Sequence, residues 1–314
     1  MRRGLARPDR DPQGGRHGLR PAGRRGIAAG RLTERAAAYG ILGSVGLLFV
    51  SPFYWALIAS FKTPAEARAI PPTWFPRTFT LDAYAQVLNW EFARYFLNSF
   101  IYATSLTVLI AFTSSIIAFT VVKLPSRAGN TLFALIVGSM MVPFATYIVP
   151  LYGQLLYVQR TLGVPMVNTY WGMILPEMIS PFGVFLLRQA ILSVPGELLD
   201  AARIDGAGRW ARVRYITIPL VMPTIAFVTI IMTLSSLMMF TETFVMTDST
   251  GHGGYAQPIG GPNYATHTVV YNIYNQAFDR HREGYASAIA AVFFCVMVLI
   301  GAAQFRYLRA KFEY

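Results

Sequence analysis

Long stretches without a charged residue recur six times along the chain, and shorter polar segments separate them. The stretches are 22 to 32 residues long, and only Glu177 interrupts one of them. A helix needs about 20 apolar residues to cross the hydrocarbon core of a membrane. The pattern therefore predicts six membrane-spanning helices, near residues 37–60, 97–121, 131–155, 169–190, 218–240 and 286–305.

Two alternative architectures fit this pattern less well. Helices buried in a soluble core do not require six charge-free runs of this length. Spanning β-strands are about ten residues long and alternate apolar with polar positions, which these stretches do not. Of the 314 residues, 54% are hydrophobic and 13% are charged, whereas about 25% charged residues are usual in soluble domains. We therefore expect an all-α, multi-pass membrane protein.

Basic residues are divided unequally between the two sides of such a protein. Six spans place both termini on one side, together with segments 123–130 and 188–214, and this side holds 20 of the 27 Lys and Arg residues. The other 7 lie in 62–96, at Arg160 and in 241–285. Because Lys and Arg favour the cytoplasmic side, both termini are expected in the cytoplasm. The net charge of +12 is then explained by membrane topology. Nucleic-acid binding is the alternative explanation of this charge, but the sequence shows no folded nucleic-acid-binding module.

The first 35 residues differ in composition from the rest of the chain. They are rich in Arg, Gly and Pro, with few aliphatic residues before Ile27. Such a segment cannot bury a core, so residues 1–35 are expected to form a disordered basic tail, followed by a transmembrane domain over 36–314. The apolar run after the tail is too long for a secretory signal peptide and lacks a small-residue cleavage pattern, so we expect a retained anchor.

The sequence offers little for catalysis. Cys295 is the only cysteine and lies inside the last expected span, so no disulfide can form within the chain. The four histidines show no metal-ligand spacing, and no GxxxxGK[ST] phosphate-binding loop is present. We therefore expect no catalytic residue, no metal and no cofactor in this chain, and no enzymatic activity of its own.

A polar block interrupts the apolar pattern between the fourth and fifth expected spans. It reads "DAARIDGAGRWARVRYITIP" and covers residues 200–219. A short helix is expected over 195–204, with Pro195 in its first turn. "DG" at 205–206 is a turn signal, so the chain is expected to bend there.

A second short helix is expected over residues 208–215, before Pro219 marks the entry to the next span. Arg209 and Arg212 share a face of this helix because they are three residues apart, and Trp210 lies on an adjacent face. A solvated connector would need the arginines to orient the protein. Such a connector would need neither the bend nor the aromatic residue. These features favour the other interpretation, in which the block is a surface that binds another molecule.

The block resembles the signature loop of the permease subunits of bacterial ABC importers, which reads E-A-A, three residues, G, nine residues, I-x-L-P. Asp200 and Ile218 replace the Glu and the Leu of that pattern. Asp200 is one methylene shorter, which shortens the reach of any salt bridge made there. In this family the loop, here 193–219, forms coupling helices that dock on a separate ATPase subunit. The resemblance implies this role for Asp200, Ala201, Ala202, Asp205, Gly206, Arg209, Trp210, Ile216 and Pro219.

The resemblance covers about residues 36–314 and implies a carbohydrate importer with a type I permease fold, located in the bacterial plasma membrane. Segments 51–84, 98–103, 140–152 and 168–176 are similar to the second permease of maltose transporters, whereas 260–278 and 284–294 are more similar to the first. The resemblance therefore implies the carbohydrate class but leaves open which of two paralogous positions the chain occupies.

The same resemblance implies several partners. They are a second permease that completes a heterodimer, two ATPase subunits that bind ATP and Mg²⁺, and an extracytoplasmic solute-binding protein that delivers a sugar or oligosaccharide. Closure of the ATPases would switch the path between its inward- and outward-facing states, which is alternating access between two conformations. The outward loops 62–96 and 241–285 are expected to contact the binding protein.

Two carboxyl groups are candidates for the solute path. Glu177 lies within the fourth expected span and Glu242 at the outer end of the fifth, and ionisable groups inside a membrane usually line a cavity or pair with another group. With Glu242, Phe240 and Thr243 would offer an aromatic face and hydrogen bonds to a sugar. The alternative for Glu177 is a structural partnership with backbone or with Arg188.

Two further functions stay open. An importer permease for another solute class, such as glycerol phosphate or amino acids, would share the coupling loop; an anionic solute would favour basic residues in the path, and no Lys or Arg lies in the interior of an expected span. A membrane enzyme would need an intramembrane histidine, paired acids or an activated nucleophile, and Ser114 and Ser115 lack an intramembrane histidine. Pro143, Pro150 and Pro181 are expected to kink their helices, as in the broken helices of transporters.

Overall fold

The computed structural model describes residues 24–246 and 266–309, and this part of the chain folds into helices joined by turns and short loops. Residues 1–23 of the expected basic tail, and residues 247–265 of the expected outward loop, lie outside the described residues.

The N-terminal helix α1 (Arg24–Ala59) begins earlier than the sequence pattern predicts. Residues 24–35 belong to the expected disordered tail but are helical. The reason is their content of Ala and Arg, which are strong helix formers, so the helix of the apolar run extends into them. Up to Tyr54 the chain forms a unit of its own, and its apolar side chains, such as Leu47 and Phe49, are more than 70% exposed. A helix of this length and apolar content suits a membrane-spanning position.

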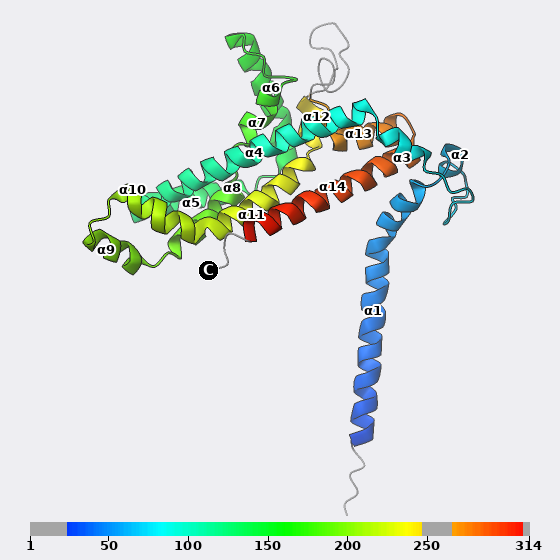
Figure 1. Cartoon of the computed structure of the whole chain (residues 1–314), viewed down its shortest axis with the longest axis horizontal. Coiled ribbons are helices and arrows are strands. Elements are labelled where there is room, and N and C mark those ends of the chain that lie inside the picture. Colours follow the sequence, from blue (N-terminus) through cyan, green and yellow to red (C-terminus); the bar gives the residue numbers. More distant parts are fainter. Residues whose placement is uncertain (1–23, 247–265, 310–314) are drawn as a thin grey trace, which may run out of the picture. The chain divides into compact units, whose positions relative to one another are not determined.

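The second unit, from Trp55 onward, is built around the long helix α4 (Trp90–Lys123). Helices α8 (Pro181–Leu192) and α11 (Ile218–Leu237) pack against α4, and α14 (Glu283–Arg309) runs beside α11 (Figure 1). Tyr102, Leu106 and Ile110 of α4 are buried in one apolar cluster. Their spacing of four residues places them on one face of the helix.

Two of the six expected spans are broken. Helices α5 (Ser126–Ser139) and α6 (Phe144–Leu162) meet at 97°, and the segment formed by α7 (Tyr170–Ile174) and η1 (Leu175–Glu177) meets α8 at 42°. Four helices in the described residues are long and apolar enough to span a membrane, and counting each bent pair as one span gives up to six.

The prolines account for part of these breaks. Pro143 directly precedes α6, and Pro181 is the first residue of α8. Proline favours these positions because it lacks a backbone N–H and disfavours helical geometry in the residue before it. Pro150 lies inside α6 without ending it, so this proline does not break its helix.

Several short helices of the second unit lie toward its two ends, whereas α7 lies below α6 (Figure 1). Helices α9 (Gly196–Ile204) and α10 (Arg209–Arg212) lie at one end. The other end carries α2 (Pro64–Ala67), α3 (Asp82–Val87), α12 (Thr241–Met246), α13 (Val269–Tyr274) and the π-helical turn η4 (Asn275–Asp279). The two groups of candidate functional residues therefore lie in different parts of the bundle.

Candidate functional site

The polar block begins with α9, which starts one residue after Pro195 and ends in a specific turn. The backbone N–H of Ala207 donates to the carbonyl of Ala202 at 2.8 Å, and that of Gly206 donates to the carbonyl of Arg203 at 3.2 Å. These two bonds form a Schellman motif, which needs a left-handed residue after the helix cap. Gly206 has φ of +84° and supplies that conformation without a Cβ clash.

The second part of the block differs from its expected form, because it is not a separate helix. α10 continues through the π-helical turn η2 (Val213–Thr217) into α11, so that one helical run extends from Arg209 to Leu237. In η2 the N–H of Ile218 donates to the carbonyl of Val213, five residues back. Pro219 has no N–H and crowds the carbonyl four residues earlier, and a π turn directly before it accommodates the ring without ending the helix.

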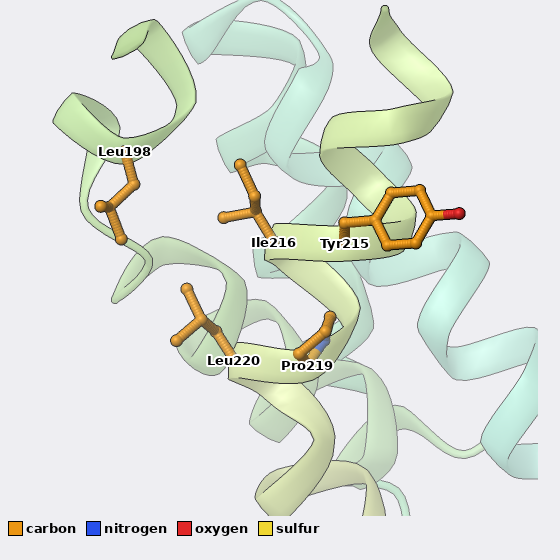
Figure 2. Close-up of a pocket in the computed structure, with 5 residues that line it drawn as sticks. All are labelled: Leu198, Tyr215, Ile216, Pro219 and Leu220. Carbon is orange, nitrogen blue, oxygen red and sulfur yellow. The ribbon is translucent and has the colours of Figure 1, made fainter. Parts of the chain in front are cut away.

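The block presents apolar side chains to the outside of the structure. Ile204, Trp210 and Tyr215 are exposed to 87%, 74% and 76%. An apolar groove of about 290 Å³ lies between α9 and the start of α11, and it is lined by Leu198, Tyr215, Ile216, Pro219 and Leu220. Figure 2 shows Leu198 facing Ile216 and Leu220 across the groove, whereas the ring of Tyr215 points away from α9. An exposed apolar patch rimmed by charge is typical of an interaction site.

Most of the other residues of the expected coupling set do not line this groove. Asp200, Ala201, Asp205 and Arg209 are exposed, and Ala202 is half-buried. Neither Asp200 nor Asp205 forms an ion pair with another described residue. These two carboxylates are therefore available to a partner.

The two candidate path acids come together in the structure. Glu177 ends η1, and Glu242 lies in the first turn of α12. Glu242 lies close enough to Glu177 for each carboxyl group to be influenced by the charge of the other, and the hydroxyl of Tyr102 donates to Oε2 of Glu177 at 3.0 Å. Tyr147 of α6 lies close enough to feel the charge of both carboxyl groups. Tyr102 thus joins α4 to η1 where the fourth span is broken, with Glu242 of α12 and Tyr147 of α6 in the neighbourhood.

Arg188 is not the partner of Glu177. Its guanidinium donates to Oδ1 of Asn130 at 3.2 Å and lies over the ring of Phe133, 3.9 Å from the centroid. The alternative role of Glu177 as a partner of Arg188 therefore has no support in the geometry. Sequence reasoning missed Tyr102, whose place on the buried face of α4 shows only once the helices are packed.

Phe240 and Thr243, the other two candidate path residues, are packed against α13 and its N-terminal cap. Phe240 belongs to an aromatic cluster with Phe244, Tyr271 and Tyr274, at centroid distances of 5.5, 6.3 and 5.1 Å. Thr243 is fully buried, and its hydroxyl lies 3.4 Å from that of Thr268, the residue that caps α13. In this conformation Thr243 braces α12 against α13 and does not line an open path.

Comparison with known proteins gives one family match over most of the chain. The model of the family described as "Binding-protein-dependent transport system inner membrane component" matches residues 26–314. The chain is 30% identical over 196 residues to the arabinooligosaccharides transport system permease protein AraQ of Bacillus subtilis, covering 61% of this chain and 68% of the relative. It is 31% identical over 202 residues to the sn-glycerol-3-phosphate transport system permease protein UgpE of Brucella suis, covering 62% and 69%.

A solved structure has the same fold. It is a chain from the crystal structure of a bacterial ABC transporter involved in the import of the acidic polysaccharide alginate, with a TM-score of 0.67 and 18% identity. The match covers 90% of this chain and 99% of that chain. The expected all-α permease fold with multiple membrane spans is thereby confirmed.

Proposed function

The chain belongs to the family of binding-protein-dependent transport system inner membrane components, and from this premise we propose that it forms half of the path of an ATP-driven importer for a sugar or an oligosaccharide. Members of this family are transport subunits and not enzymes, so the chain works by changing conformation. The observation that supports the proposal most directly is the polar block, whose Schellman turn and apolar groove form a compact surface for another subunit.

This surface has the features that an ATPase contact needs. Leu198 and Leu220 are about half exposed on the two sides of the groove, and an apolar side chain of a partner can fill the space between them. Arg209 and Asp205 lie outside the groove and offer charges of both signs for a polar rim. Interfaces with an apolar centre and a polar rim are usual between protein subunits. We propose that the ATPase docks here, and that ATP and Mg²⁺ bind only in that partner.

The assembly that follows contains a second permease, two ATPase subunits and a solute-binding protein on the outer side. We place both termini and the polar block in the cytoplasm, because 20 of the 27 basic residues fall on that side. ATP-driven closure at the block then biases the pair of permeases between an inward- and an outward-facing state.

A neutral solute fits the path better than an anion does. Glu177 and Glu242 lie near each other, and neither forms an ion pair with a described Lys or Arg. A phosphate or carboxylate brought beside them would meet like charge in a region of low dielectric. Hydroxyl groups of a sugar would instead donate hydrogen bonds to the carboxyl oxygens. Glycerol phosphate, for which UgpE is named, is the second candidate.

Purification from mild detergent tests the importer part of this proposal. The tagged chain is expected to co-purify with an ATPase and a second permease, and Leu198→Asp is expected to release the ATPase because it places a charge in the groove. Leu192→Asp is the matched control, since Leu192 is 51% exposed but does not line the groove. A wild-type chain that purifies alone would overturn the proposal.

Stimulation of ATP hydrolysis tests the solute. The complex is reconstituted with its binding protein, and arabino-oligosaccharides, gluco-oligosaccharides and glycerol 3-phosphate are compared. Stimulation by a neutral oligosaccharide supports the carbohydrate proposal. Stimulation by glycerol 3-phosphate alone would contradict it while leaving the importer function intact.

A further inference from the structure

A second cavity lies at the opposite end of the helical unit from the polar block. Its volume is about 310 Å³, and its walls come from the segment after α1, from α2 and α3, and from the start of α14. Gly284 brings these elements close together. A Cβ atom at this position would lie 3.1 Å from the carbonyl oxygen of Ala59, the last residue of α1. The cavity therefore lies next to the end of α1 and the beginning of α14, where the apolar part of each helix stops.

Positive charge is concentrated in this cavity. Four basic residues line it, namely Lys62, Arg68, Arg280 and Arg282, with two acids, Asp82 and Glu283. Four positive and two negative groups leave a formal charge of +2. Only 7 basic residues are expected on the outer side of the membrane, and these four, from two segments far apart in the sequence, are the majority of them. Such a concentration on the side that normally holds few basic residues calls for a local function.

The basic side chains are held in place, but their donors are not used up. Lys62 is almost fully buried, donates to the carbonyl of Thr73 and lies over the ring of Trp55, so its role is structural. Arg68 donates to the carbonyl of His281 and pairs with Glu283 at 3.6 Å. Arg282 donates to Gln86 and lies over the ring of Tyr285. A guanidinium has five N–H donors, so both arginines keep donors for a ligand.

Arg280 is the freest of the four. Its backbone N–H donates to the carbonyl of Asn275, but no described residue forms a hydrogen bond or an ion pair with its side chain. A planar guanidinium at the edge of a cavity, next to two others that are already oriented, is suited to an anion with several acceptor oxygens, such as a phosphate group.

The surroundings indicate the depth of the cavity in the membrane. α1 ends at Ala59 and α14 begins at Glu283, and both are candidate spans. Trp55 and Trp74 pack edge to face at a centroid distance of 5.6 Å beside Lys62, and Trp74 is 67% exposed. Tryptophan gathers at the level of the lipid head groups, and a guanidinium group at that level can bind a phosphate through charge-assisted hydrogen bonds.

From these observations we propose that the cavity binds the phosphate of an anionic phospholipid, with Arg280 and Arg282 as its principal ligands and Arg68 at its edge. A volume of about 310 Å³ suits one head group. The other candidate partner, an acidic surface of the solute-binding protein, would need a broader contact than this recess provides. The proposal does not depend on which solute is transported.

Native mass spectrometry of the purified complex tests this site. The complex is extracted in mild detergent, and bound phosphatidylglycerol is counted for the wild type, for Arg280→Gln with Arg282→Gln, and for Arg77→Gln. Arg77 belongs to the same outer loop but does not line the cavity, so it is the matched control. We expect the double variant to lose one bound lipid, with occupancy lower by about tenfold, and the control to retain it.

Arg280→Gln alone keeps the test decisive if the double variant does not assemble, because its side chain has no described partner to lose. Excess inorganic phosphate is added in a parallel sample, and retention of the lipid there shows that the acyl chains contribute to binding. Equal lipid counts in wild type and variants would overturn the proposal. So would a variant that keeps its lipid but no longer responds to the binding protein, because the cavity would then be a protein contact.

Discussion

The hydroxyl of Tyr102 donates a hydrogen bond to Oε2 of Glu177 at 3.0 Å, and so joins two residues 75 positions apart in the sequence. Tyr102 is 1% exposed and lies at the centre of an apolar cluster on α4. Glu177 is the last residue of η1, directly before the break that leads into α8. The bond therefore fixes the broken end of the fourth span to the most continuous helix of the unit, and it sets the position of the carboxyl group opposite Glu242.

Replacing Tyr102 with Phe should weaken this attachment. The variant loses the donor to Glu177 but keeps the ring that fills the core, so we expect the assembled complex to lose about 1–2 kcal/mol of stability. Thermal unfolding in detergent measures the change. Tyr157→Phe is the control, since Tyr157 lies on α6 with 70% of its surface exposed. Equal unfolding of the two variants would show that the bond contributes nothing to stability.

Neutralising the acid pair should change which solutes pass. Glu177→Gln combined with Glu242→Gln removes the negative charge that an anionic solute would meet. We expect the ratio of glycerol 3-phosphate uptake to neutral oligosaccharide uptake to rise by about tenfold in proteoliposomes, which is a difference of about 1.4 kcal/mol. Glu91→Gln, in the first turn of α4 and exposed, should leave the ratio unchanged. An unaltered ratio in the double variant would place the acids outside the path.

Gly206 should be essential for coupling. Its φ of +84° disfavours any side chain, whereas Gly208 in the same turn has φ of −63°. We expect Gly206→Arg to reduce solute uptake strongly while membrane insertion stays normal, because the strained turn reorients α9 at a cost of about 1–2 kcal/mol. Gly208→Arg adds the same charge without this strain and should retain most of the uptake. Normal transport by the Gly206 variant would refute the coupling role.

Acid should loosen the outer segment around Glu66. Its Oε1 accepts hydrogen bonds from the backbone N–H of Arg77 at 2.7 Å and from the Thr73 hydroxyl at 2.9 Å. These bonds, chiefly that from Arg77, hold the pKa of Glu66 below its ordinary value. Because the pKa is lower in the folded state, the bonds stabilise the segment above the ordinary carboxyl pKa, and this contribution is lost as the pH falls through the folded-state pKa.

Fluorine NMR of fluorotryptophan at Trp74, in the same segment, follows this change. We expect its signal to shift as the pH falls through the acid range, and Glu66→Gln to remove the dependence. Glu91→Gln should leave the titration as in the wild type. A signal that titrates identically in the Glu66 variant would assign the transition to another group.

The apolar pattern predicted where the long apolar helices lie, because charge-free length is a direct requirement of the hydrocarbon core. The predicted number of six is reached when each bent helix pair is counted as one span. It could not predict the 97° bend between α5 and α6, since a broken and a straight helix have the same composition. The helical start of α1 was missed for a related reason. Arginine lowers the apolar content of a segment without lowering its helix propensity.

The candidate sites were predictable to different degrees. The turn at Gly206 followed from local spacing, because it depends on residues within one helical turn. The contact of Glu177 with Tyr102 and the burial of Thr243 depend on how distant helices pack, which one sequence does not specify. The continuity of α10 with α11 was only partly predictable. Pro219 predicted a break in the helix, but the π turn η2 before it lets the helix continue.

The uninterrupted helical run from Arg209 to Leu237 has a mechanical consequence. At 1.5 Å per residue, its 29 residues form a rod about 43 Å long, with Trp210 near one end and the approach to Glu242 at the other. Such a rod transmits both translation and torsion. If the helix tilts at the Trp210 end, its other end is displaced, and the displacement grows with the length of the helix. The π turn determines how the side chains at one end are rotated about the helix axis relative to those at the other end. Adding or removing one residue in η2 would rotate one end against the other by about 100°.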